Sequence, residues 1–290
     1  LGVPLIVAAL LGAALASTDP ATLVPVFRQV RIRERVAQTV MSESALNDAT
    51  GAILTFGVLA VATGSEFSIG ASLADLGKQA LVGLLVGGVA GYLAAVCIAH
   101  ERLSFLVEYA PLVTLMAVIG AYLGADSLQA SGFMAVFTFG IVLGNKDALG
   151  FAMSAREQQR LDEFVATTAL IMRMFIFILL GAQVDFALMG RYLAGGVAVI
   201  AVFMLVARPI TVFACATPDR RARWSTAEML FMSWTRETGV IPAALAGLLL
   251  GMKAPGADVI AAVTFIAVLM TILIQATTTR WVAARLGLLA

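Results

Sequence analysis

The segment from Met41 to Ala49 carries several oxygen-bearing side chains at helical spacing. Ser44 and Asp48 are four residues apart, as are Glu43 and Asn47, so each pair should share one face of a helix. A hydroxyl one turn below a carboxylate offers the oxygen ligands that a hard cation such as Na⁺ prefers. The same residues could instead cap the start of a helix. We favour an ion site, because a helix that crosses a membrane must begin in the basic segment before Glu43.

A second acidic residue, Asp19, lies in a segment that should interrupt a helix. Pro20 removes a backbone donor and disfavours helix at Asp19, yet apolar residues continue as far as Phe27. This pattern predicts a helix broken near membrane depth, whose termini can bind ions or balance charge. The alternative is a helix that ends in a proline turn at the membrane surface.

Three arginines, Arg173, Arg208 and Arg236, lie inside apolar segments. An ionised group at bilayer depth costs at least ~2.5–3.5 kcal/mol on insertion scales, so these residues should face protein or water and pair with acidic groups. Arg236 is followed by Glu237 and, further on, by Gly239 and Pro242 in a second interrupted segment. One interrupted segment in each half of a chain is typical of inverted-repeat transporters.

Membrane helices are the elements that must position these residues. The chain is 61% hydrophobic and 13% charged, whereas soluble domains carry roughly a quarter charged residues. Without alternation of polar and apolar residues, we predict an all-α polytopic helix bundle with broken crossing helices. Nine stretches could each cross a hydrocarbon core of about 30 Å, namely 1–17, 45–63, 79–98, 106–124, 128–144, 164–182, 192–213, 226–251 and 257–277.

The loops between these nine spans fall into two sets with very different numbers of basic residues. One set holds thirteen Lys and Arg, and the other holds three, Lys78, Arg191 and Lys253. Because cytoplasmic loops carry the excess of Lys and Arg, the richer set should be cytoplasmic. We therefore expect the start of the chain to be external and its end cytoplasmic.

We expect a single transmembrane domain over residues 1–290, with 1–144 as the end of a first half and 145–290 as the second half. Since the sequence starts without Met or a basic region, we also expect it to begin inside a longer protein. A net charge of +1 gives no footprint for nucleic acid. Cys97 and Cys215 have no metal-type spacing, so we expect no cofactor and a lipid bilayer as the main partner.

The motifs resemble those of the monovalent cation:proton antiporter family, which includes the NhaP-type sodium/proton antiporters and the animal sodium/proton exchangers. The resemblance spans nearly the whole chain and is carried by Ala16-Ser17-Thr18-Asp19-Pro20-Ala21, Ser42-Glu43-Ser44-Ala45-Leu46-Asn47-Asp48, Ala130-Ser131-Gly132-Phe133-Met134-Ala135-Val136, Phe175-Ile176-Phe177-Ile178-Leu179-Leu180-Gly181 and Ala207-Arg208-Pro209. It implies a multi-pass protein of the cell membrane with thirteen helices. This chain would lack about the first four, some of which form the interface of a homodimer.

The resemblance also implies roles for the polar residues. Asp48 would bind either the cation or a proton, with Asn47 as the neutral neighbour typical of electroneutral members. Thr18 and Ser44 would supply further oxygens to the metal ion, and Asp19 would offset the charge of the broken-helix termini.

Glu43 would form a buried structural ion pair with a membrane arginine, for which we expect Arg236, with Arg208 as the other candidate. Family members usually have Gly-Leu-Arg-Gly around this arginine, whereas here Glu237 follows Arg236. The departure makes Glu237 a possible second group in the proton chemistry.

On this interpretation the chain is not an enzyme but exchanges Na⁺ or Li⁺ for H⁺, with K⁺/H⁺ antiport in the same family as the alternative. Burial disfavours a charged Asp48 and a bound cation restores it, so proton and cation compete. A channel would need a carbonyl filter or a ring of charge, and the sequence shows neither. An intramembrane aspartyl protease using Asp19 and Asp48 would need a Gly-x-Gly-Asp stretch, which surrounds neither residue.

Overall fold

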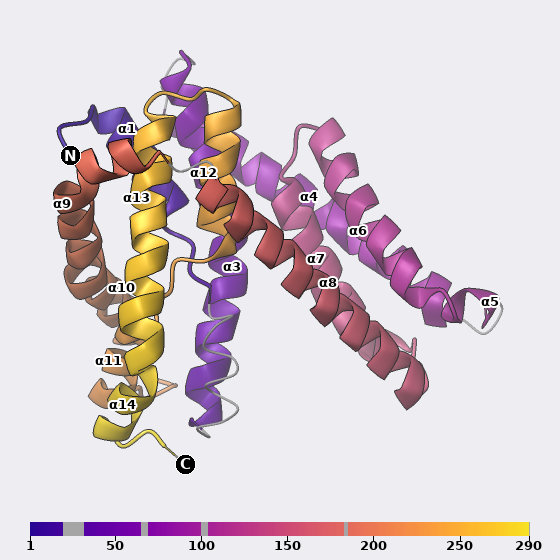
Figure 1. The fold of residues 1–290 in the computed structure, drawn as a ribbon. Coiled ribbons are helices and arrows are strands. Elements are labelled where there is room, and N and C mark those ends of the chain that lie inside the picture. The colour runs from indigo at the N-terminus through magenta and orange to yellow at the C-terminus, as the bar shows by residue number, and fades with distance from the viewer. Residues whose placement is uncertain (20–31, 65–68, 100–103, 183–184, 290) are drawn as a thin grey trace. The chain divides into compact units, whose positions relative to one another are not determined.

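A computed structural model describes residues 1–19, 32–64, 69–99, 104–182 and 185–289 (Figure 1). They form helices, with one isolated antiparallel bridge between Ile32 and Leu289. The predicted continuation of the broken segment beyond Asp19 lies outside the described residues, as do Arg28, Arg31 and Arg102 of the basic loops. The chain therefore has the predicted all-helical fold class.

The chain divides into two compact units, one formed by Leu1–Thr63 with Ile176–Ala290 and the other by Gly64–Phe175. The units are defined by packing, so they do not test the predicted division of the sequence after Gly144. The first unit contains α1 (Leu5–Ala14), α3 (Glu34–Ala62), α9 (Phe186–Val202), η3 (Phe203–Ala207), α10 (Arg208–Ala216), α11 (Thr226–Trp234), α12 (Val240–Gly251), α13 (Ala257–Met270), η4 (Thr271–Ala276) and α14 (Thr277–Arg285).

Two apolar clusters hold the first unit together. One joins α1, α9, α12 and α13 through fully buried side chains such as Leu10, Ile200 and Ile260. The other joins the start of α3 to α11 and the end of the chain through Val36, Phe231 and Leu288. Because lipid tails are as apolar as these side chains, close packing rather than release from water holds such helices together in a membrane.

A polar clamp fixes the start of α3 against α11. Ser225 and Glu228 form a capping box that begins α11. The same Glu228 carboxylate accepts hydrogen bonds from Arg35 Nε at 2.9 Å and from Arg35 Nη2 at 2.6 Å. Arg35 also lies 4.4 Å from the ring centroid of Trp224. A bidentate guanidinium of this kind sets orientation as well as distance, so α3 has a defined register against α11.

The second unit contains α4 (Ile69–Ala99), α5 (Ser104–Val107), α6 (Ala110–Ser127), α7 (Gly132–Gly144), η2 (Lys146–Leu149) and α8 (Ala155–Ala182) as far as Phe175. A Cβ added at Gly87 of α4 would lie 2.0 Å from the carbonyl oxygen of Ala135, so only glycine allows α7 to approach α4 this closely. At the start of α8, hydrogen bonds from the hydroxyl and the amide of Ser154 lower the pKa of the Glu157 carboxyl.

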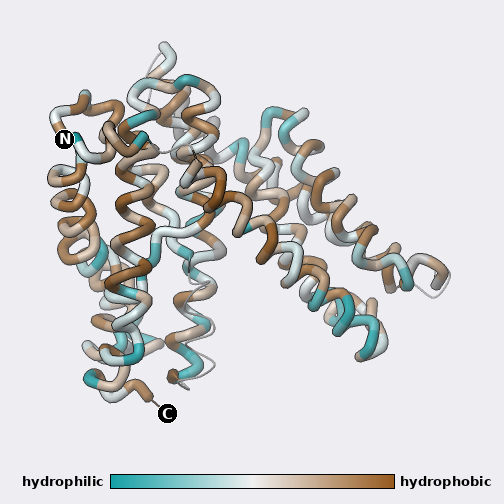
Figure 2. Tube along the Cα trace, in the orientation of Figure 1, coloured by the Kyte–Doolittle hydropathy of each residue, from teal (hydrophilic) through white to brown (hydrophobic). Residues whose placement is uncertain are grey.

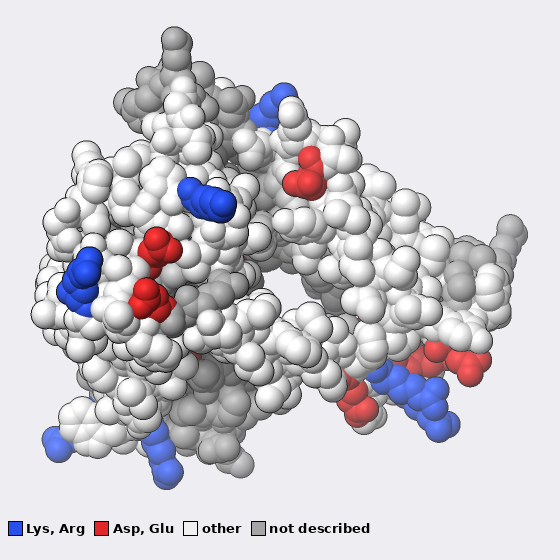
Figure 3. All heavy atoms as spheres, turned by 45° about the horizontal axis from the view of Figure 1, so that its top comes forward, with Lys and Arg blue, Asp and Glu red and all other residues white. Residues whose placement is uncertain are grey.

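Five described helical stretches are long and apolar enough to cross a membrane, and three apolar helices, α1, α7 and α12, are shorter. The long stretches are Glu34–Ala62, Gly77–Ala99, Ala110–Ser127, Phe186–Ala216 and Ala257–Arg285. Hydrophilic residues gather near helix ends, such as the start of α8 (Figure 2). On the face drawn in Figure 3 most of the described surface is uncharged.

The predicted span 1–17 ends early as a helix, and the predicted span 226–251 is interrupted. α1 ends at Ala14 and residues 17–19 are not helical, while the predicted span 226–251 consists of α11 and α12 separated by residues 235–239. The span 192–213 is continuous but contains the π-helical turn η3 directly before Arg208 and Pro209. Pro209 has no backbone N–H, which accounts for an irregular turn at that point.

Candidate functional site

The polar residues of α3 lie in the interior of the helix and face one segment. α3 begins at Glu34, in the basic segment before Glu43, so this prediction is confirmed and the alternative that Ser44 or Asp48 caps a helix start is wrong. Ser44, Asn47, Asp48 and Gly51 have spacings of three and four residues, which put them on one side of α3.

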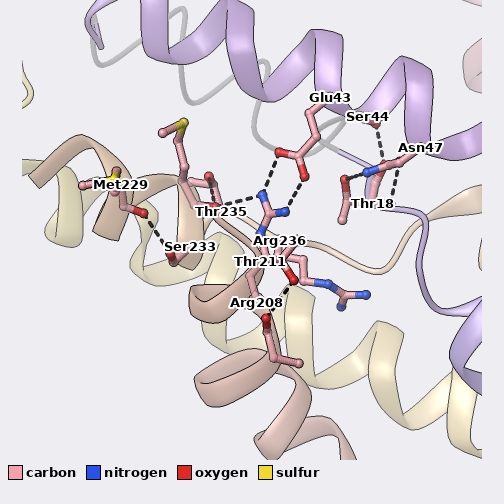
Figure 4. Close-up of polar contacts among 12 residues, drawn as sticks. Thr18, Glu43, Ser44, Asn47, Arg208, Thr211, Met229, Ser233, Thr235 and Arg236 are labelled. Carbon is pink, nitrogen blue, oxygen red and sulfur yellow. Dashed lines mark hydrogen bonds and ion pairs between the residues drawn. The ribbon is translucent and has the colours of Figure 1, made fainter. Parts of the chain in front are cut away.

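Ser44 and Asn47 hold the non-helical segment that follows α1. Ser44 Oγ donates a hydrogen bond to the carbonyl oxygen of Thr18. The amide group of Asn47 bonds Thr18 twice, donating from Nδ2 to the hydroxyl at 2.8 Å and accepting from the backbone N–H at 3.1 Å (Figure 4). Three of the residues predicted for the ion site are therefore brought together, and Thr18 is held by both its backbone and its side chain.

Asp48 lies one position beyond Asn47 and accepts a hydrogen bond from the Ser17 hydroxyl at its Oδ1 atom. Ser17 is fully buried, whereas Asp48 is half-buried. Sequence reasoning did not include Ser17 in the site, although it lies next to Thr18 in the motif Ala16 to Ala21. The signal was a second hydroxyl next to Thr18 at the end of the predicted span 1–17, directly before the expected break at Asp19.

The Asp19 side chain lies against the N-terminus of α12. The Asp19 Oδ2 atom accepts from the backbone N–H of Val240 at 3.3 Å, and the Asp19 N–H donates to the carbonyl oxygen of Glu237 at 3.0 Å. The N-terminus of a helix carries a partial positive charge that a carboxylate stabilises. A Cβ at Gly239 would lie 1.9 Å from the Asp19 Cβ, so the contact depends on glycine at this position.

Arg236 makes the opposite contact at the end of α1. It is 3% exposed, donates from Nη2 to the carbonyl oxygen of Leu15 and lies 4.0 Å from the ring centroid of Phe203. Leu15 is the C-cap of α1, where unpaired carbonyls give a partial negative charge. Each of the two helix termini thus faces a residue of opposite charge from the other interrupted segment.

The predicted ion pair of Glu43 with Arg236 is wrong, because Glu43 pairs with the other candidate, Arg208. Both Nη atoms of Arg208 donate to the Glu43 carboxylate, Nη2 at 2.8 Å, and Nη2 also donates to the carbonyl oxygen of Met232 at 3.0 Å (Figure 4). Arg236 is not available for this pair, since its side chain is directed to Leu15 and Phe203. The motif resemblance matched Arg236 to the family's arginine, whereas the structure pairs Glu43 with Arg208.

Glu237 is 3% exposed and stands in the break between α11 and α12 beside Arg236. Its backbone carbonyl is the group that accepts the Asp19 N–H. A role of the Glu237 side chain in proton chemistry stays a prediction.

The assembled site offers oxygen atoms of several kinds around one carboxylate. Asp48 supplies the negative charge and is bonded by Ser17, Ser44 supplies a hydroxyl, and Thr18 supplies a carbonyl and a hydroxyl. Carbonyl, carboxylate and hydroxyl oxygens suit a hard cation. Because the oxygens come from an irregular backbone segment and from a helix, a small movement of either could admit or release an ion.

The chain is similar to membrane transport proteins over nearly its whole length. A family model described as "Sodium/hydrogen exchanger, transmembrane" matches residues 1–285. The Na⁺/H⁺ antiporter 1 of Methanocaldococcus jannaschii is 35% identical over 247 residues, which is 82% of this chain and 55% of that protein. The K⁺/H⁺ antiporter NhaP of Alkalimonas amylolytica is 32% identical over 242 residues, which is 82% of this chain and 40% of that protein.

A solved structure has a similar fold. The sodium proton antiporter MjNhaP1 from Methanocaldococcus jannaschii at pH 8 superposes with a TM-score of 0.74 at 28% identity, over 97% of this chain and 71% of that one. The two curated relatives above are matched over 55% and 40% of their length.

Proposed function

The chain belongs to the sodium/hydrogen exchanger family, and from that premise we propose that it exchanges a monovalent cation for protons across a membrane. The observation that carries the proposal is Asp48 in the interior of a long apolar helix, facing the oxygens of the non-helical segment after α1. A carboxylate at that place is costly unless it binds a partner.

Competition for Asp48 accounts for exchange. A half-buried carboxylate favours the proton because burial penalises the charged form, and a bound cation favours the ionised form. Only the protonated or the cation-loaded carboxylate is neutral enough to pass through a low-dielectric barrier, so the empty charged form is held back. If the site opens to each side in turn, protons and cations move in opposite directions.

Na⁺ or Li⁺ is the cation that we favour, with K⁺ as the alternative. The Methanocaldococcus relative is named a Na⁺/H⁺ antiporter and the Alkalimonas relative a K⁺/H⁺ antiporter, at nearly equal identity. The hydroxyl, carbonyl and carboxylate oxygens at Asp48 are compatible with either ion, and the choice depends on the size of the cavity they form.

We further propose that exchange is electroneutral and that the protein is a homodimer of the cell membrane with the end of this chain in the cytoplasm. The neutral Asn47 beside Asp48 supports one proton per cation. The excess of Lys and Arg in one set of loops supports the orientation.

Proteoliposomes test the activity directly. We expect a pH dye inside vesicles that contain the full-length protein to respond when NaCl, LiCl or KCl is added, and the order of the responses gives the selectivity. Asp48→Asn removes the exchangeable proton and keeps the volume, so the variant should be folded and inactive. Asp126→Asn, the same change at an exposed position in the other unit, is the matched control. Appreciable cation-dependent proton flux in Asp48→Asn would contradict the assignment of the site.

A further inference from the structure

Ser17 is a buried hydroxyl with a direct contact to the proposed exchange carboxylate. It is fully buried in the non-helical segment after α1, and its Oγ donates to Asp48 Oδ1. The other carboxylate oxygen, Oδ2, accepts no hydrogen bond from the residues that the structure describes. The contact therefore occupies one oxygen and leaves the second for a proton or a cation.

We propose that Ser17 is a positioning residue that sets the balance between proton and cation at Asp48. The inference rests on the proposed function. A donated hydrogen bond stabilises the ionised carboxylate more than the protonated one, which favours loss of the proton.

The position of Ser17 makes this role specific. The hydroxyls of Ser44 and Thr18 bond Thr18 and Asn47, so they act on the backbone segment rather than on the carboxylate. A Cβ at Gly51 would lie 3.4 Å from both the Ser17 Cβ and the Ser17 amide nitrogen, which means that α3 is in close contact with Ser17 one turn beyond Asp48. Ser17 is thus held against the helix that carries the carboxylate.

The charged groups around Asp48 set a background that the Ser17 variants leave unchanged. Asp19, in the same segment as Ser17, opposes a second negative charge on Asp48. On α3, Glu43 is paired with Arg208 of α10. The break before α12 contributes Arg236, which contacts Leu15 of α1, and Glu237. A change in proton affinity on removing one hydroxyl can therefore be assigned to the lost hydrogen bond.

The test is the pH dependence of the apparent KM for Na⁺, or for whichever cation the wild-type protein transports, in proteoliposomes of the full-length protein. In Ser17→Ala the proton should be held more tightly, because the ionised form has lost a hydrogen bond. We expect the pH of half-maximal exchange to rise by about one unit, which is a tenfold change in proton affinity of the size that one charge-assisted hydrogen bond supplies. The apparent KM should rise several-fold at low pH and match wild type at alkaline pH, where protons no longer compete.

Two further variants keep the test decisive. Ser17→Cys keeps a weak donor of similar size, so its pH profile should lie between those of wild type and Ser17→Ala. Thr55→Val removes another fully buried hydroxyl from α3 that bonds the Gly51 carbonyl at 2.8 Å, and its profile should not move.

The outcomes separate this inference from the proposed function. An unmoved pH profile in both Ser17 variants, or a lower maximal rate alone, overturns the positioning role. An apparent KM that is raised equally at all pH values also overturns it, because Ser17 would then bind the cation itself. Absence of cation-dependent proton flux in the wild-type protein would instead refute the proposed function.

Discussion

The ion pair between Glu43 and Arg208 makes an energetic prediction that depends on its asymmetric burial. Arg208 is 6% exposed, whereas the Glu43 side chain is 33% exposed. Glu43→Gln leaves a buried guanidinium without its countercharge, which costs roughly 3–5 kcal/mol in buried pairs. Arg208→Met leaves a carboxylate that water can reach and a free Met232 carbonyl, so we expect a smaller loss of about 1–3 kcal/mol.

The double variant distinguishes a pair from two separate sites. With both charges absent, no unpaired buried charge is left. The loss of unfolding free energy in the double variant should therefore be smaller than the sum of the two single losses by roughly 1–3 kcal/mol. The cycle of Glu43→Gln with Arg236→Met is the matched control and should show a smaller coupling, because Arg236 is directed to Leu15.

Denaturant unfolding of the purified protein in detergent micelles gives these free energies, with helix content as the readout. The reasoning is refuted if the losses at Glu43 and Arg208 are additive. It is also refuted if Arg208→Met costs clearly more than Glu43→Gln, because the difference in burial would then not govern the energy. A larger coupling of Glu43 with Arg236 than with Arg208 would support the pair of Glu43 and Arg236 that was predicted from the sequence.

Two other substitutions test how the non-helical segment after α1 contacts α3 and the break before α12. Asn47→Asp keeps the oxygen that accepts the Thr18 N–H and loses the donor to the Thr18 hydroxyl, so the variant should fold. The added carboxylate should make exchange respond to an imposed K⁺/valinomycin potential. No response to the potential would show that the new carboxylate does not titrate. Gly239→Ala puts a methyl group where the Asp19 side chain lies, so we expect a loss of melting temperature and of transport, whereas Gly190→Ala, with open space at its Cβ, should change neither.

The helical class and the break before α12 could be predicted from the sequence because composition, glycine and proline act locally. The cluster from Ser233 to Pro242 predicted a break, and residues 235–239 are not helical. Residues 17–19, which precede Pro20, are not helical either, and the predicted continuation of that segment lies outside the described residues. The start of α3 before Glu43 followed from the length that a membrane helix needs. These features require no knowledge of which helices are neighbours.

The pairing of charges could not be predicted, because it depends on where side chains from distant segments meet. Arg208 and Arg236 are both arginines in apolar segments, and either could satisfy Glu43 on the basis of sequence alone. Their roles are separated by η3 and by the break at residues 235–239, which turn one side chain to α3 and the other to α1. Ser17 was missed because the predicted span 1–17 placed it in a helix, whereas it lies in the non-helical segment that reaches Asp48.

The charged residues around Asp48 have a consequence for the stoichiometry of the proposed exchange. Asp19 faces the positive end of α12, Arg236 faces the negative end of α1, and Glu43 is neutralised by Arg208. These contacts compensate one another whether or not an ion is bound, so the carboxylate of Asp48 is the charge that a proton or a cation must neutralise. One carboxylate exchanges one proton for one cation, and no net charge then crosses the field, which would otherwise act with about 2.3 kcal/mol per elementary charge per 100 mV. This count requires Glu237, buried in the same break, to keep one protonation state throughout the cycle. If an imposed K⁺/valinomycin potential drives wild-type exchange with Na⁺ as the substrate, then Glu237 or Asp19 titrates with Asp48 and exchange is not one to one.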